Sequence, residues 1–233
     1  MLPYFKKLIR LTFFILIFQF LLPELTLGQQ FFRIKADFSI KEKGADGKEQ
    51  LTMGQVYYDK TSKKIVYNIK FPEKETWVII DTTLYRIVDS KIKETRTIPA
   101  IAEFSMFHLC LNGGITDYGL KQSFYTIEKV EKENNMVITT WKAPDKMSKT
   151  FGKILLSQEN KKLFGVVLFS PTNVLLSKQF FKNYTNVNGL EFPTEIVQIL
   201  YIKGKESYQL TTYKNIIVDD LKEDNIYNYR LFH

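Results

Sequence analysis

The chain has 233 residues, with 33 Lys and Arg against 25 Asp and Glu, which gives a net charge of +8. Its 45% hydrophobic and 15% aromatic residues can build a core, which excludes the disordered, collagen-like and coiled-coil classes. Cys110 is the single cysteine, and His108 and His233 are the two histidines, so an internal disulfide and the usual Cys/His zinc site are both excluded. We expect one domain that folds without disulfide or metal.

The N-terminus has the three parts of a secretory signal peptide. Lys6, Lys7 and Arg10 precede an apolar run over 11–22, and small residues lead to Gly28. An uncleaved membrane anchor is the alternative, but twelve helical residues span about 18 Å, short of a hydrocarbon core of about 30 Å. We therefore predict a signal peptide over 1–28, cleaved near Gly28/Gln29, and an exported domain over 29–233. Its basic excess is typical of a solvated surface, with attraction to anionic lipid head groups as the alternative.

The mature chain begins with strands. Residues 32–41 alternate apolar and polar side chains with period 2, which indicates a half-buried antiparallel strand. Further strands are expected over 51–58, 65–71, 77–81 and 84–88. The loops between them are too short for parallel crossovers, so the sequence predicts a meander.

The second half has the same pattern. Strands are expected over 124–130, 136–141, 153–157, 163–169, 175–184, 191–202 and 207–218, with turns around Asn134, Asn160 and Gly204. About 11–12 strands in one flat sheet would leave long exposed edges. We therefore predict a mainly β fold: a strongly curved antiparallel sheet that forms a partly closed barrel.

One segment departs from this pattern, and it predicts a helix over 98–111. Thr97 is placed to cap it, Pro99 lies in its first turn, and Asn112-Gly113-Gly114 ends it. The segment is apolar on most sides, so we expect it to be buried on most sides. Two arrangements satisfy this: the helix plugs the mouth of the curved sheet as a lid, or it forms the core of the domain.

The sequence lacks the motifs of common catalytic sites. It has no Gly-rich phosphate loop, HExxH, GxSxG or CxxC motif. His108 and Cys110 stand two apart in the predicted helix, so their side chains diverge and do not make a thiol-imidazole pair. We predict that the protein is not an enzyme.

Short motifs over 38–112 carry a family resemblance. They are Ala36-Asp37-Phe38, Gly54-Gln55-Val56-Tyr57-Tyr58, Ile65-Val66-Tyr67-Asn68-Ile69, Trp77-Val78-Ile79-Ile80-Asp81 and Leu84-Tyr85, followed by the apolar helix. In this order they resemble LolA and its LolB-like relatives, the periplasmic carriers of outer-membrane lipoproteins. The resemblance implies an unclosed antiparallel barrel whose concave apolar face, covered by helices, holds lipoprotein acyl chains. It also implies no cofactor and no bond chemistry.

We therefore expect a periplasmic carrier that binds lipoprotein acyl chains or another lipid for transfer toward the outer membrane. The expected partners are transient inner- and outer-membrane donor and acceptor proteins, without nucleic acid, and the expected state is a monomer. The alternatives are a sensor or scaffold module of the same fold that binds a protein partner, and an outer-membrane barrel, which the central helix disfavours. The expected cavity residues are Phe38, Ile40, Tyr67, Ile69, Trp77, Ile79, Val167 and Phe169, and the expected lid residues are Ile101, Phe104, Phe107 and Leu111.

Overall fold

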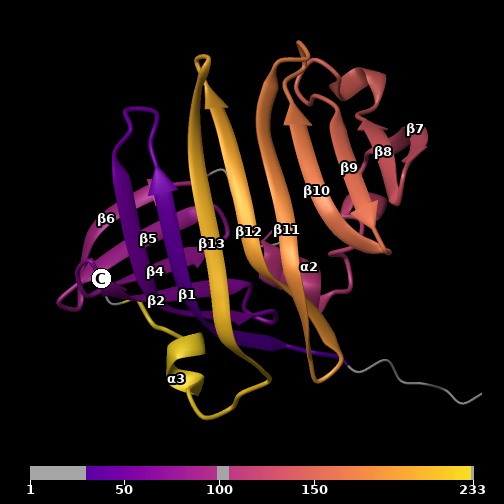
Figure 1. The fold of residues 1–233 in the computed structure, drawn as a ribbon. Coiled ribbons are helices and arrows are strands. Elements are labelled where there is room, and N and C mark those ends of the chain that lie inside the picture. Colours follow the sequence, from indigo (N-terminus) through magenta and orange to yellow (C-terminus); the bar gives the residue numbers. More distant parts are fainter. Residues whose placement is uncertain (1–29, 99–104, 232–233) are drawn as a thin grey trace, which may run out of the picture.

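The computed structural model describes residues 30–98 and 105–231. Thirteen antiparallel strands form one sheet in the order β6-β5-β4-β3-β2-β1-β13-β12-β11-β10-β9-β8-β7 (Figure 1). The sheet curves but does not close, because β6 and β7 are its two edges. This confirms the predicted mainly β, unclosed architecture. The expected signal peptide lies outside the described residues.

The strands of the first half are β1 (Arg33–Lys43), β2 (Glu49–Asp59), β3 (Lys64–Phe71), β4 (Glu75–Ile80), β5 (Thr83–Val88) and β6 (Lys91–Thr97). Those of the second half are β7 (Thr126–Glu133), β8 (Met136–Lys142), β9 (Ile154–Glu159), β10 (Lys162–Phe169), β11 (Leu175–Val187), β12 (Leu190–Ile202) and β13 (Lys205–Val218). Among the described residues, the helices are α2 (Met106–Leu111) and α3 (Asp224–Tyr227), with 3₁₀ turns at Leu120–Gln122 and Asp145–Met147.

Twelve strands lie close to their predicted positions, and β6 is an additional one. Its sequence, KIKETRT, has no alternation of apolar and polar residues, and Ile92 is its one partly buried residue. A strand at a sheet edge that packs little against a core has no hydrophobic period to detect. The predicted turns around Asn134, Asn160 and Gly204 are confirmed, since all three residues adopt positive φ between strands.

Helix α2 is shorter than the predicted helix over 98–111. Thr97 is the last residue of β6 rather than a helix cap, and residues 99–104 lie outside the described residues. The N-cap is Ser105, whose Oγ accepts a hydrogen bond from the N–H of His108 at 3.3 Å. The predicted end is confirmed, because Asn112 caps the helix and Gly113 adopts a φ of 68°, which favours glycine.

The two faces of the sheet carry separate apolar clusters. The larger one fills the concave face, around α2. The smaller one lies on the outer face of β2–β5, where Tyr227 of α3 packs edge-to-face on Tyr57 with ring centroids 5.3 Å apart. Arg33 fixes this C-terminal segment, since its guanidinium binds Asp59 at 2.6 Å and Asp224 at 2.7 Å. No helix in the described part of the chain is long and apolar enough to span a membrane.

Candidate functional site

Strand register determines which side chains line the concave face. Residues directly opposite one another in antiparallel strands point to the same side of the sheet. Phe38 of β1 lies opposite Gly54 of β2, and Gly54 lies opposite Ile69 of β3. Tyr67 of β3 lies opposite Trp77 of β4. Because Phe38 and Ile69 are buried in the larger cluster, this row lies on the concave side.

Helix α2 occupies the centre of the concave face through Phe107. This ring is only 2% exposed and stacks on Tyr58 of β2 and Phe192 of β12, both at 6.1 Å between centroids. Tyr213 of β13 meets it edge-on at 5.6 Å. Phe107 is therefore surrounded by aromatic rings from three strands, a packing that adds to the free energy of burial.

One polar contact ties α2 to the sheet. His108 Nδ1 lies 2.5 Å from the hydroxyl of Tyr58, whose ring is fully buried. The pair satisfies the two polar groups where the helix enters the apolar interior. Cys110 is buried among apolar residues, and this burial raises the pKa of its thiol.

The chain after α2 continues along the concave face of β9–β11. Tyr118 packs on Phe181 at 6.1 Å between centroids, and its hydroxyl donates to Gln179 Oε1 at 3.1 Å. Gln158 Nε2 donates to the carbonyl of Thr116 at 2.8 Å. The described part of the connection between β6 and β7 therefore contacts the inner face of β2, β9, β11, β12 and β13.

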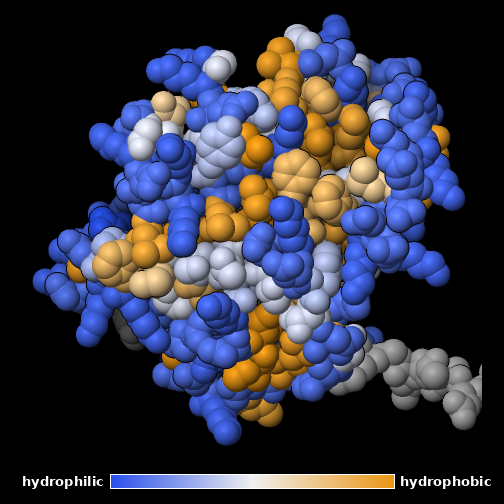
Figure 2. Space-filling view, in the orientation of Figure 1, coloured by the Kyte–Doolittle hydropathy of each residue, from blue (hydrophilic) through white to orange (hydrophobic). Residues whose placement is uncertain are grey.

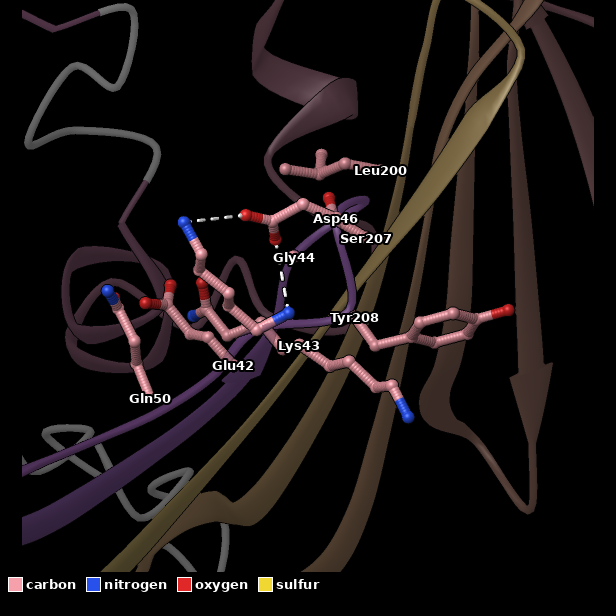
Figure 3. A pocket seen from close by; sticks show the side chains of 10 residues that line it. Glu42, Lys43, Gly44, Asp46, Gln50, Leu200, Ser207 and Tyr208 are labelled. Carbon is pink, nitrogen blue, oxygen red and sulfur yellow. Dashed lines mark hydrogen bonds and ion pairs between the residues drawn. The ribbon is translucent and has the colours of Figure 1, made fainter.

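Beyond this covering the concave face becomes polar. The register aligns one row of side chains across five strands: Gln179, Gln198, Gln209, Glu42 and Gln50. Part of the row lines a cleft of about 400 Å³ at the β1–β2 hairpin (Figure 3). Figure 3 also shows Lys43 and Tyr208 extending away from Glu42 and Gln50, on the other side of the sheet. The concave face thus has an apolar zone and a polar zone.

Two clefts open next to the apolar zone. One, of about 300 Å³, lies at the C-terminal end of α2 and has walls from Phe31, Leu111 and Leu190 with Lys161 and Lys162 among its lining residues. The other, of about 620 Å³, lies over β2–β6. Its lining is mixed. The apolar residues Leu51, Phe71, Trp77 and Leu84 contribute to it, together with the ion pair of Arg86 Nε with Glu75 Oε2 at 2.5 Å and the charged residues Glu42, Glu49, Glu94 and Arg96. Volumes of this order are typical of small-molecule sites.

The interior around α2 is a dry environment. Burial raises the pKa of Tyr67 to about 12 and that of Tyr118 to about 12. Burial also raises the pKa of Tyr213 well above its ordinary value. Neutral hydroxyls and hydrocarbon dominate this zone, which disfavours charged groups and suits apolar ones.

The expected cavity residues divide between the two faces. Phe38, Ile40, Tyr67, Ile69, Trp77 and Ile79 belong to the concave cluster or pack against it. In β10, Val166 and Leu168 belong to that side, so the alternating Val167 and Phe169 point to the outer face. The four consecutive apolar residues Val166 to Phe169 and the register shift between Leu163 and Gly165 leave the sequence of β10 without a pattern that shows which face is concave.

The expected lid residues are only partly described. Phe107 and Leu111 are buried in the concave cluster, whereas Ile101 and Phe104 lie outside the described residues. The partners of the lid, Tyr58, Phe192 and Tyr213, were not among the expected site residues. Tyr58 lies in one of the motifs of the family resemblance, and Phe192 and Tyr213 lie in predicted strands. An alternating pattern does not show which rings meet across strands, so these contacts could not be predicted from the sequence.

Comparison with known proteins identifies the fold. No protein-family model matches the chain, and no curated protein matches it. Among solved structures, a LolA superfamily protein from Nitrosomonas europaea is 16% identical with a TM-score of 0.55, and the match covers 87% of this chain and 92% of that one. A DUF1329 family protein from Desulfovibrio piger is 13% identical with a TM-score of 0.59, covering 85% and 90%.

A third structure, a domain from Vibrio parahaemolyticus described as an outer membrane lipoprotein-sorting protein, is 13% identical with a TM-score of 0.57, covering 84% of this chain and 89% of that one. At these identities the likeness concerns the fold. This chain has an open, curved antiparallel sheet whose concave face is filled by an apolar helix, and its fold is LolA-like.

Proposed function

We propose that the protein is a periplasmic, non-enzymatic carrier that binds acyl chains of a lipoprotein or another lipid against the concave face of its sheet, for transfer toward the outer membrane. The observation that carries the proposal is the packing of α2. A helix of six residues inserts Phe107, Leu109, Cys110 and Leu111 into the concave apolar cluster. Two solved structures of similar fold, a LolA superfamily protein and a lipoprotein-sorting domain, support the proposal.

The energetics favour exchange between helix and acyl chain. Burial of one Phe or Leu side chain contributes about 1.5–3 kcal/mol, and one buried methylene contributes about 0.8 kcal/mol. About four methylenes therefore offset the loss of one side chain from the concave face. The four buried side chains of α2 therefore correspond to about sixteen methylenes, so an acyl chain of that length can replace the helix, and return of α2 provides the release step.

The same fold supports a second function in which α2 stays in place. The aromatic ring cluster around Phe107 already fills the concave face, and a filled interior suits a scaffold or sensor module that binds a protein partner. The two functions differ in one event: whether α2 leaves the concave face.

Native mass spectrometry of the protein purified from the periplasm without detergent, followed by lipid extraction of the same sample, tests the proposal. A carrier yields acyl species bound in stoichiometric amount. A protein that stays free of lipid, even after incubation with lipoprotein-bearing membranes, contradicts the carrier. A stable protein partner recovered in the same preparation would then support the scaffold.

A further inference from the structure

The outer face of the sheet is covered over one half only. The C-terminal segment with α3 packs on the outer side of β2–β5. Over β10–β12 no described element covers the outer side, and Figure 2 shows an apolar surface there, bordered by hydrophilic residues. We call this surface the outer apolar patch; it consists of Val167, Phe169, Phe180, Val197 and Ile199 of β10–β12 and the adjacent Leu210 of β13.

Register places these six side chains together on the outer face. Phe180 lies opposite Val197, and Val197 lies opposite Leu210. In each strand they alternate with residues of the concave cluster, such as Phe181 and Ile196. All six are half-buried, although a monomer normally keeps such a contiguous apolar area small.

Lysines stand within the outer apolar patch and at its border. Lys178 lies between Val167 and Ile199 in the cross-strand register, and its Nζ is 5.7 Å from the ring centroid of Tyr201. Lys153 Nζ lies 4.8 Å from the ring centroid of Phe169. Neither ammonium forms an ion pair with a carboxylate of the described residues.

The nearby carboxylates have other hydrogen-bond partners. Glu195 accepts a hydrogen bond from Asn183 Nδ2 at 3.2 Å, and Glu206 accepts one from the hydroxyl of Tyr208. The patch thus combines apolar and aromatic side chains with two ammonium groups that form no ion pair among the described residues. Lysine side chains of this kind lay their methylenes on apolar surface and extend the charge outward.

We propose that the outer apolar patch is a docking surface for an anionic lipid bilayer. Apolar and aromatic side chains enter the headgroup region while Lys153 and Lys178 contact lipid phosphates. A second copy of this chain fits less well, because a two-fold contact through the patch would bring the central lysines of both copies together without a counter-charge. The proposal is independent of whether the concave face carries an acyl chain.

Flotation with vesicles tests this docking. The protein should bind vesicles that contain phosphatidylglycerol more tightly than vesicles of phosphatidylcholine alone, and salt should weaken the binding. A Lys153→Gln, Lys178→Gln double variant should lose about 25-fold in affinity, since each lysine near an anionic surface contributes about five-fold. Leu176→Asn, at a residue 44% exposed on the same outer face, should also weaken binding.

The matched control is a Lys48→Gln, Lys142→Gln double variant, which removes the same net charge at positions on the hairpin tip and near the β7 edge. It should retain the affinity of the parent for the anionic vesicles. Equal losses in the two double variants would overturn the proposal, because overall charge would then explain binding. Absence of vesicle binding, or a dimer in sedimentation that Leu176→Asn dissolves, would also overturn it. Binding of a soluble fatty acid, measured on the same variants, reports on the concave face separately.

Discussion

The exchange of α2 for an acyl chain makes one variant decisive: Phe107→Ala. If α2 must leave before an acyl chain binds, the side chain of Phe107 stabilises only the closed form. Its removal should then strengthen binding of a fatty acid, because less packing opposes the open form. If Phe107 instead contacts the ligand, the same substitution should weaken binding.

The magnitude follows from the ring cluster around Phe107. Replacement of a fully buried Phe by Ala lowers the free energy of unfolding by about 3–5 kcal/mol. We expect about 3 kcal/mol for Phe107, because the short helix α2 can shift and fill part of the space. Since about 1.4 kcal/mol corresponds to a factor of ten, affinity should rise by up to about 100-fold. The melting temperature of the ligand-free protein should fall at the same time.

The assay is titration of a fluorescent fatty acid into detergent-free protein, with thermal unfolding of each sample. Met53→Ala is the matched control, because Met53 is 39% exposed on the outer face of β2 and should leave both quantities unchanged. Weaker or unchanged binding by Phe107→Ala, in a protein whose melting temperature has dropped, would refute displacement of α2.

Three further predictions concern the interior and its supports. Both tryptophans, Trp77 and Trp141, pack in the concave cluster, so brominated acyl chains should quench the intrinsic fluorescence; unquenched emission at saturating ligand would contradict binding there. Arg33→Ala should lower the free energy of unfolding in urea by about 3 kcal/mol, because it removes the cation that pairs with the buried carboxylate of Asp59. A loss below about 1 kcal/mol, the value of a surface ion pair, would contradict this. Burial raises the pKa of Tyr67 to about 12. Because its ordinary pKa is 10.0, the neutral hydroxyl contributes fully to stability below pH 10.0. Between pH 10.0 and 12 the free energy of unfolding should fall by about 1.4 kcal/mol per pH unit. Urea titrations from pH 9 to 12 should show this slope reduced in Tyr67→Phe.

The sequence predicts the strands best where burial is one-sided. In β1, Ile34, Ala36 and Phe38 are buried and alternate with half-buried polar residues, so the period-2 pattern and the register are both readable. In β10 the pattern fails, since apolar side chains occur on both faces, and this led to the assignment of Val167 and Phe169 to the interior. The outer apolar patch is the physical reason for that ambiguity.

The helical parts were less predictable than the strands. The predicted cap at Thr97 belongs to β6, whose charged residues resemble a loop, and the observed cap at Ser105 lies within the expected helix. Helix α3 has four residues, too few for an apolar period of about 3.6 to be recognised in the sequence. It is stabilised by the packing of Tyr227 in the apolar cluster on the outer face. The rings that surround Phe107 come from strands far apart in sequence, so only the fold brings them together.

The open edges at β6 and β7 have a mechanical consequence. In a closed barrel the number of strands and their stagger fix the diameter, whereas these two strands are not hydrogen-bonded to each other. The sheet can flatten or tighten by small changes of twist at each strand pair, without breaking a ladder. The space between its two halves is therefore adjustable, and we expect a carrier built on it to accept ligands of different width.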